Sequence, residues 1–372
     1  MKDVYEIRKT NENQLLSAAK LRVEKFPTLK KIYDDDFLIK LVRYKSHYDN
    51  ILLFWLVNDN PIDSLITAKF LQDIENGVKL FQFDNNFSIF KRKLRQWKTI
   101  PFESAITELE FAAEYCKKEY KIEFEPLLPN GKKGDFCINK DCLKIYFEVK
   151  MIFSKASLQE DAIITDLSDR CDGIVHPFII SIDLEEGFRL NQSAAFSKYL
   201  QKKLKEIEAT SINFPFSLVY PESGNPTIKI DLIKRVPKGE RGYIMGFTYG
   251  GGIKSSWTDV RRKIVSGVSQ LHPDYPGVII VRPYGLHTLE YDIQNALYGD
   301  LSVRFNRVGS QVFRRGDRIF GVNKNKRLSV VVHYKKILQN SGYTKEKIVY
   351  HNPFAAHKIA RDIFEGENVT QF

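Results

Sequence analysis

The sequence has few cysteines and no long apolar run, and these absences exclude several classes of protein. Its four cysteines, at positions 116, 137, 142 and 171, are too few and too irregularly spaced for a disulfide framework or a zinc site built from paired Cys-x-x-Cys motifs. The most apolar run, Ile51–Val57, is far shorter than the roughly 20 residues that span a bilayer, and the first residues lack the apolar stretch of a signal peptide. We therefore expect a cytoplasmic protein that has no membrane partner.

The chain also lacks zinc-type histidine spacing, internal repeats and low-complexity tracts. Hydrophobic residues make up 43% and aromatic residues 13% of the chain, which is enough apolar surface for a packed interior and excludes general disorder. The formal net charge is +11, a balance that attracts polyanions such as nucleic acids. Charge alone is weak support for such a partner, because many basic proteins do not bind nucleic acids.

The 372 residues are enough for one core domain with substantial additions. Residues 1–100 have apolar side chains at three- and four-residue spacing, as at Leu38 and Leu41, which indicates a mainly helical region. A stronger helix is expected at Glu103–Tyr120. Three short strands joined by tight turns should follow it, at Lys121–Glu125, Asp135–Ile138 and Leu143–Lys150. This order predicts an antiparallel meander beside a helix.

The rest of the chain alternates helices and strands. Its expected elements are a strand at Phe178–Ile182, a helix at Gln192–Ile207, a helix at Thr258–Leu271 and strands at Gly277–Val281 and Leu328–Tyr334. Such alternation is typical of an α/β fold.

Two carboxylates and a lysine should meet within the meander. Glu148 and Lys150 are two apart on a strand and therefore emerge on the same face, while Asp135 begins the preceding strand. Adjacent carboxylates repel one another unless a cation lies between them, and oxygen ligands of this kind suit Mg²⁺. Lys150 is then placed to orient or deprotonate a water molecule that attacks phosphorus.

A third carboxylate precedes the meander in the helix. Glu108 shares a helix face with Ala112 and Tyr115, where an unpartnered acid would be unfavourable, so we expect it to assist the metal site directly or through water. Glu110 is the competing candidate and points roughly 200° away around the helix. We prefer Glu108 for this role.

A Glu-x-Lys triplet alone is common on strands and can be a surface ion pair worth under about 1 kcal/mol. Here the triplet Glu148-Val149-Lys150 follows Asp135 by one strand and Glu108 by one helix. In this order and spacing the chain resembles the PD-(D/E)XK nuclease superfamily. Gly134 stands where the motif has proline, a residue that supplies no ligand.

The resemblance implies a restriction-endonuclease-like α/β core, with a mixed central sheet flanked by helices. Its parts would be a helical N-terminal addition (1–100), a core (101–153 and 250–350), an insertion (154–249) and a C-terminal tail (351–372). It also implies that Asp135, Glu148 and the backbone carbonyl of Val149 hold Mg²⁺, with Mn²⁺ as a substitute. Lys263 and Gln270 would support the site from the helix after the insertion.

Several basic residues are candidates for contacts with a phosphate backbone. They are Arg261 and Arg262 in that helix, and Arg314, Arg315 and Arg318 in a segment broken by glycines. Lys91, Arg92, Lys93, Arg95 and Lys98, with Phe90 and Trp97 among them, form a basic-aromatic patch that could also follow a backbone. A solvated surface explains each group nearly as well.

Taken together, the residues and the resemblance predict a magnesium-dependent nuclease. Its preferred substrate would be double-stranded DNA, and it would be able to form a homodimer. Two alternatives stay open: an RNA-directed nuclease of the same fold, and a non-catalytic nucleic-acid-binding or assembly protein that retains the fold. The presence of both carboxylates and the lysine favours an enzyme.

Overall fold

The computed structural model describes residues 12–43, 51–57, 61–83, 86–152, 155–185, 187–210, 212–237, 239–249, 257–283, 290–299, 301–306, 309–314, 318–322, 324–339, 342–366 and 369–371. The chain divides into two compact units. Unit 1 comprises Met1–Ile152 and Ser256–Phe372, and unit 2 comprises Phe153–Ser255. Unit 2 thus interrupts the sequence of unit 1 once.

A seven-stranded mixed sheet forms the centre of unit 1, in the order β1-β2-β3-β8-β11-β12-β13. The strands are β1 (Lys121–Phe124), β2 (Phe136–Lys140), β3 (Leu143–Ile152), β8 (Gly277–Pro283), β11 (Leu328–Gln339), β12 (Gly342–His351) and β13 (Val369–Gln371). β1, β2 and β3 form an antiparallel meander, and β3, β8 and β11 run parallel. The predicted meander is therefore present, and the fold is α/β.

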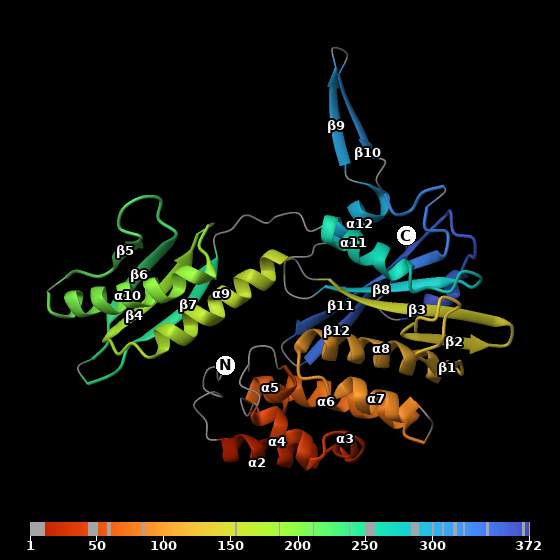
Figure 1. Cartoon of the computed structure of the whole chain (residues 1–372), viewed down its shortest axis with the longest axis horizontal. Coiled ribbons are helices and arrows are strands. Elements are labelled where there is room, and N and C mark those ends of the chain that lie inside the picture. Colours follow the sequence, from red (N-terminus) through yellow and green to blue (C-terminus); the bar gives the residue numbers. More distant parts are fainter. Residues whose placement is uncertain are drawn as a thin grey trace. The chain divides into compact units, whose positions relative to one another are not determined.

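Helices cover both faces of this sheet (Figure 1). α8 (Thr99–Lys117) packs on one face, and α11 (Trp257–Val268) and α12 (Glu290–Tyr298) pack on the other. The central strand β8 accordingly carries the continuous apolar run Val278–Val281, which is fully buried, as a parallel strand covered on both faces requires. On the neighbouring β3, Phe147 contacts Tyr115 of α8, so Glu148 and Lys150 face the side of α11.

Further helices extend the layer around α8, as the spacing of apolar residues predicted. They are α2 (Glu12–Val23), α3 (Pro27–Ile32), α4 (Asp35–Arg43), α5 (Ile51–Val57), α6 (Pro61–Phe81) and α7 (Asn86–Leu94). Their apolar side chains join those of α8 and of the sheet in one core. None of the helices within the described residues is long and apolar enough to cross a membrane.

The C-terminal part of unit 1 contains more strand than the sequence predicted. β11 extends beyond the predicted Leu328–Tyr334 and pairs antiparallel with β12, which was not predicted. Residues 351–372, expected to form a tail, include the 3₁₀ helix η3 (Arg361–Phe364) and β13, which pairs with β12. A separate antiparallel pair is formed by β9 (Leu301–Asn306) and β10 (Gly309–Arg314).

Unit 2 has its own sheet and its own core. Its elements are α9 (Lys155–Asp172), β4 (Phe178–Leu184), η2 (Leu190–Gln192), α10 (Ser193–Glu208), β5 (Phe216–Tyr220), β6 (Ile228–Arg235) and β7 (Tyr243–Tyr249). The strands pair in the order β5-β6-β4-β7. Apolar side chains of β4 and β6, such as Ile180 and Ile230, are fully buried together with Leu167 of α9 and Phe196 of α10.

Candidate functional site

The predicted carboxylates meet at the start of β2, beside β3. The register pairs Phe136 with Phe147, so Asp135, one residue before β2, lies next to Glu148. Its Oδ2 atom accepts a hydrogen bond of 2.7 Å from the backbone N–H of Val149. Asp135 is thereby held against the Glu148-Val149-Lys150 triplet by the backbone of β3 itself.

Lys150 is fixed by two side chains from different elements. Its Nζ atom donates to Glu148 Oε1 and to Gln270 Oε1, each at 2.6 Å. Gln270 lies in the turn that ends α11, where its backbone N–H bonds to the carbonyl of Gly267 at 2.8 Å. The ammonium group of Lys150 is therefore oriented by the end of α11 as well as by its own strand.

Glu108 reaches the site from α8 and is almost fully buried. It forms an ion pair with Lys93, whose Nζ atom also lies 4.0 Å from Asp135 Oδ1. The Lys93 ammonium therefore bridges Glu108 and Asp135. Sequence analysis placed Lys93 only in a basic-aromatic patch, because no spacing rule connects a residue of α7 with a strand that begins about forty positions later.

The electrostatics of the site favour a positive ligand. Burial, followed by the charge of Asp135, raises the pKa of both Glu108 and Glu148 to about 8. Burial opposes the charged form of Lys93, but the charges of Glu108 and Asp135 outweigh this effect and raise the pKa of Lys93. Among the described ion pairs, Lys93 meets Glu108 and Asp135 and Lys150 meets Glu148, so two ammonium groups face three carboxyl groups, and a proton or a further cation can neutralise the third.

The donor set fits the magnesium ion that the sequence predicted. Glu148 Oε2 is buried and has no hydrogen-bond partner among the residues that the structure describes, a position unfavourable for an ionised oxygen without a cation. Within the described residues, no three His, Cys, Asp or Glu side chains converge as a ready-made metal cage. Mg²⁺ does not require one, since it usually binds one or two carboxylates and shares its shell with water and substrate phosphate. Asp135, Glu148 and the backbone carbonyl of Val149 are the groups that would hold it.

Lys263, on α11, belongs to the same neighbourhood. Burial, followed by the charge of Lys150, lowers its pKa. Arg261 and Arg262 precede it on α11, and Arg262 pairs with Asp259 at 2.5 Å while 58% of its side chain stays exposed. This helix thus brings several basic side chains to the side of the sheet that carries Lys150.

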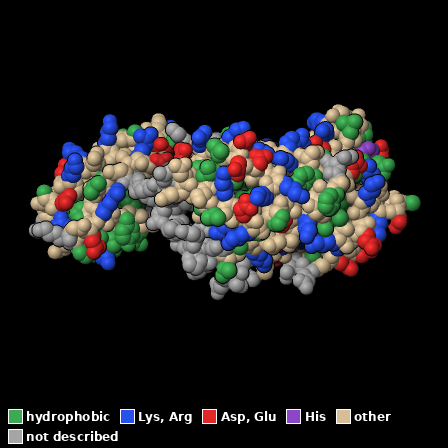
Figure 2. Space-filling view, turned by 90° about the horizontal axis from the view of Figure 1, so that it is seen from below, with side chains coloured by type: hydrophobic (Ala, Val, Ile, Leu, Met, Phe, Trp, Pro, Cys, Tyr) green, Lys and Arg blue, Asp and Glu red, His purple; other side chains and the backbone are tan. Residues whose placement is uncertain are grey.

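The other arginines predicted to contact a phosphate backbone belong to the C-terminal part of unit 1. Arg314, on β10, donates to the carbonyl of Gly299 at 2.8 Å and lies over the Tyr298 ring. Arg318 is exposed, and Arg315 lies outside the described residues. Figure 2 shows lysine and arginine side chains interspersed with acidic ones over the face it presents, so the positive charge is not gathered into one patch there.

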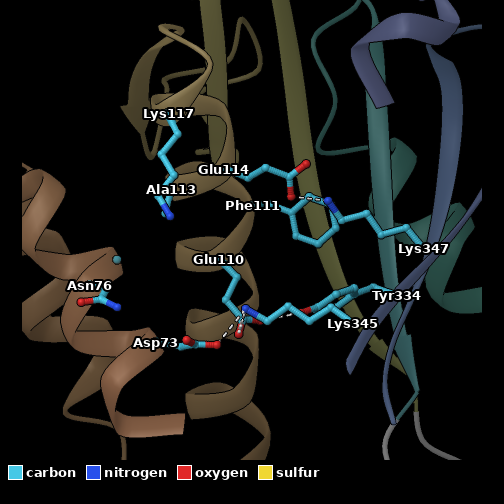
Figure 3. Close-up of a pocket in the computed structure, with 11 residues that line it drawn as sticks. Asp73, Asn76, Glu110, Phe111, Ala113, Glu114, Lys117, Tyr334, Lys345 and Lys347 are labelled. Carbon is cyan, nitrogen blue, oxygen red and sulfur yellow. Dashed lines mark hydrogen bonds and ion pairs between the residues drawn. The ribbon is translucent and has the colours of Figure 1, made fainter. Parts of the chain in front are cut away.

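Glu110, the competing candidate on α8, belongs to a different ion network. Its carboxylate pairs with Lys336 at 2.8 Å and Lys345 at 3.2 Å, and it accepts a hydrogen bond of 2.9 Å from the Tyr334 hydroxyl. Burial opposes ionisation, but these lysines outweigh it and lower the pKa of Glu110 to about 2. Glu110 lines a pocket of about 260 Å³. Figure 3 shows Asp73 and Lys345 beside it. These contacts tie α8 to β11, β12 and α6.

No protein-family model, no curated protein and no solved structure matches the chain. A function must therefore be argued from the site itself. The groups that the structure brings together are Glu108, Asp135, Glu148, Lys150 and Gln270, which the sequence predicted for this site, and Lys93, which the sequence placed only in the basic-aromatic patch.

Proposed function

We propose that the protein is a magnesium-dependent nuclease that hydrolyses phosphodiester bonds, with DNA as its substrate. One observation carries this proposal: Asp135 and Glu148 lie side by side on neighbouring strands, next to a lysine held by two hydrogen bonds. Neighbouring acidic oxygens with surplus negative charge suit a divalent cation, and a cation with a fixed ammonium group suits a reaction that builds negative charge on phosphate.

The order of elements around the site supports a restriction-endonuclease-like core. α8 is followed by the meander β1-β2-β3, and after unit 2 by α11 and the parallel strand β8. This is the helix, three strands, helix and strand that the resemblance to the PD-(D/E)XK nucleases implies. Glu108, Asp135 and the Glu148-Val149-Lys150 triplet occupy the corresponding positions along it.

Each side chain then has a distinct part in hydrolysis. When bound, a magnesium ion would stabilise negative charge on the phosphate oxygens and lower the pKa of a coordinated water molecule. Asp135 and Glu148 would hold the cation, and Lys150 would orient the attacking water or take its proton. Gln270 holds Lys150 in position, because its carboxamide oxygen accepts from the ammonium group. Glu108 holds the Lys93 ammonium group close to Asp135.

Fewer observations support DNA as the substrate than support the hydrolysis of phosphodiester bonds. The net charge of +11 and the arginines of α11 suit any polyanion, and the same site would hydrolyse RNA. A non-catalytic binding protein would keep the net charge, but it would not require Lys150 to be oriented by Glu148 and Gln270. Cleavage assays with DNA and with RNA as substrates separate these alternatives.

The test is cleavage of plasmid, linear and single-stranded DNA and of RNA, with Mg²⁺ and with EDTA. We expect Mg²⁺-dependent cleavage of DNA by the wild type. Lys150→Met should lower the rate by about 10²- to 10⁴-fold, as expected for the loss of a group that moves or orients a proton. Asp135→Asn should abolish cleavage at low Mg²⁺ because it removes a metal ligand.

Two nearby substitutions serve as controls. Asp141→Asn changes the same residue type in the turn between β2 and β3, where the positive φ of 55° suits asparagine equally well. Lys144→Met removes a lysine of β3 that pairs with Glu123 at 3.3 Å, away from the site. Both controls should cleave like the wild type. Persistent cleavage by Asp135→Asn and Lys150→Met would reject the site, and RNA-only cleavage would reject the substrate.

A further inference from the structure

Lys93 enters the acidic site from outside the sheet and its covering helix α8. It belongs to α7, which is fixed independently by Phe90 and Leu94, both fully buried. The Phe90 ring packs edge-on against Phe124 of β1, with ring centroids 4.3 Å apart. Because α7 is anchored by these contacts, Lys93 is held at the site by the fold rather than by its ion pairs alone.

The Lys93 ammonium lies beside two carboxyl groups of the site, where a positive charge is stabilising. It contacts Glu108 and lies 4.0 Å from Asp135 Oδ1, and only 17% of its side chain is exposed. A divalent ion bound to Asp135 would therefore lie within a few ångströms of a lysine charge in a partly dehydrated site, where like charges repel strongly. The ammonium group and the metal ion require the same carboxylate.

We infer that Lys93 is an internal cation that neutralises Glu108 and Asp135 in the metal-free protein and competes with the metal ion for them. It is a positioning residue: it keeps the carboxylates together before metal binds and sets the metal concentration at which the site fills. This inference deepens the proposed function by assigning a regulatory part to the helical N-terminal region, and it rests on that function for the identity of the metal.

The competition has a direct consequence for α7. Metal binding would release Lys93 from Asp135, so occupancy of the site and the conformation of this side chain are linked. By the same linkage, removal of the lysine charge must strengthen metal binding. A lysine that only stabilised the fold would give the opposite result, because a loosened site binds metal more weakly.

The experiment measures Mg²⁺ and Mn²⁺ binding to the full-length protein by isothermal titration calorimetry. Lys93→Met removes the charge, Lys93→Gln removes the charge but keeps a hydrogen-bond donor towards Glu108, and Lys93→Arg keeps the charge. We expect both neutral variants to bind either metal more tightly, on the order of tenfold, and Lys93→Arg to bind like the wild type. The melting temperature in EDTA should fall in both neutral variants and recover with Mg²⁺.

Lys91→Met is the matched control. Lys91 lies two residues earlier on α7 and pairs with Asp34 at 3.5 Å, with 38% of its side chain exposed. Its loss should leave metal affinity unchanged. Equal or weaker metal binding by folded Lys93→Met and Lys93→Gln would overturn the inference, as would the absence of metal binding by the wild type and every variant.

Failure of the inference and failure of the proposed function give different results. The wild type could show Mg²⁺-dependent cleavage while the neutral Lys93 variants keep an unchanged metal affinity. That result would overturn the inference and support the proposed nuclease function. Tighter metal binding by those variants, without cleavage of any nucleic acid, would support the internal cation and reject the nuclease.

Discussion

The groups around Glu148 determine the pKa of its carboxyl group. Its Oε1 atom accepts a hydrogen bond from Lys150, while Oε2 is buried and finds no hydrogen-bond partner in the described part of the chain. The carboxylate of Asp135 lies beside it. A glutamate in water would be ionised at neutral pH, but here the ionised form is penalised by burial and repulsion. Burial and the charge of Asp135 penalise the ionised form of Glu108 in the same way.

The raised pKa values predict how stability depends on pH. Glu108 and Glu148 ionise near pH 8 in the folded protein but near their ordinary value of 4.5 in the unfolded chain. Between these values the folded state binds more protons, so its stability falls as pH rises through this window. We expect the melting temperature in EDTA to fall between about pH 5.5 and about pH 8.5.

The Glu148→Gln variant, which cannot ionise at that position, should show a smaller fall over the same range, as measured by scanning calorimetry. Glu123→Gln is the control, because Glu123 is exposed on β1. A fall in Glu148→Gln as large as in the wild type would show that Glu148 is not the source.

At the scale of elements, α8 serves two charge networks with different faces. Glu108 faces Lys93 and Asp135, whereas Glu110 and Glu114 face lysines of β11 and β12. Glu103 pairs with Arg282, whose guanidinium is buried against α8 from β8. One helix therefore both contributes to the site and fixes the layer that supports it.

α11 makes its contribution through a close approach to β3. A Cβ atom added at Gly267 would lie 3.0 Å from Lys150 Cε and 3.1 Å from Ile279 Cδ1. Glycine at this point of the helix lets the Lys150 side chain pass beneath α11 to Gln270. The helix thus accepts a residue of poor helix propensity where the site needs space.

This contact predicts an unusual result for Gly267→Ala. In a helix the change would ordinarily stabilise by about 1 kcal/mol, but here the new methyl group displaces Lys150 and offsets that gain. We expect a melting temperature close to that of the wild type and a rate of cleavage about 10²-fold lower, because small misplacements of a reacting group are that damaging. Thermal denaturation and the cleavage assay together measure the two effects.

Ser266→Ala, at the adjacent exposed position of α11, should change neither property. Wild-type activity in Gly267→Ala would mean that Lys150 tolerates displacement, which would argue against its role in the reaction.

At the scale of the whole molecule, the cores of the two units are separate. The apolar cluster of unit 2 runs from Ile163 to Leu232, and the clusters of unit 1 draw none of their described members from Phe153–Ser255. Each unit therefore buries its own apolar surface, which is the main source of folding free energy.

We predict that residues 153–255 fold in isolation. The fragment should unfold cooperatively, with a free energy of unfolding on the order of 5 kcal/mol, the lower end of the range for small domains. Denaturation followed by circular dichroism, with amide dispersion in the NMR spectrum, measures this.

Phe196 is fully buried in this core, so Phe196→Ala should destabilise the fragment by about 3–5 kcal/mol and leave it only marginally stable. A fragment without a cooperative transition would show that unit 2 depends on unit 1.

Local pattern determined a large part of the fold. Strands alternate their side chains with a period of two, so the sequence alone placed Glu148 and Lys150 on one face and predicted the meander. The buried run of β8 and the helix that became α11 were predicted for similar reasons. β12 was not, because its Thr344-Lys345-Glu346-Lys347 segment reads as solvated, and only in the fold do ion pairs with α8 and α6 leave it half-buried.

The composition of the site depended on tertiary structure. Periodicity favoured Glu108 over Glu110 without deciding between them, since the choice depends on which lysines each carboxylate meets. The resemblance predicted Gln270 for the site, whereas the sequence named Lys93 only as part of a basic-aromatic patch and did not connect it with these acids. These partners lie on elements far apart in the sequence, and local pattern says nothing about how such elements pack. The sequence by itself determined that Asp135, Glu148 and Lys150 lie together in one hairpin. Only the tertiary structure decided which charged groups neutralise them.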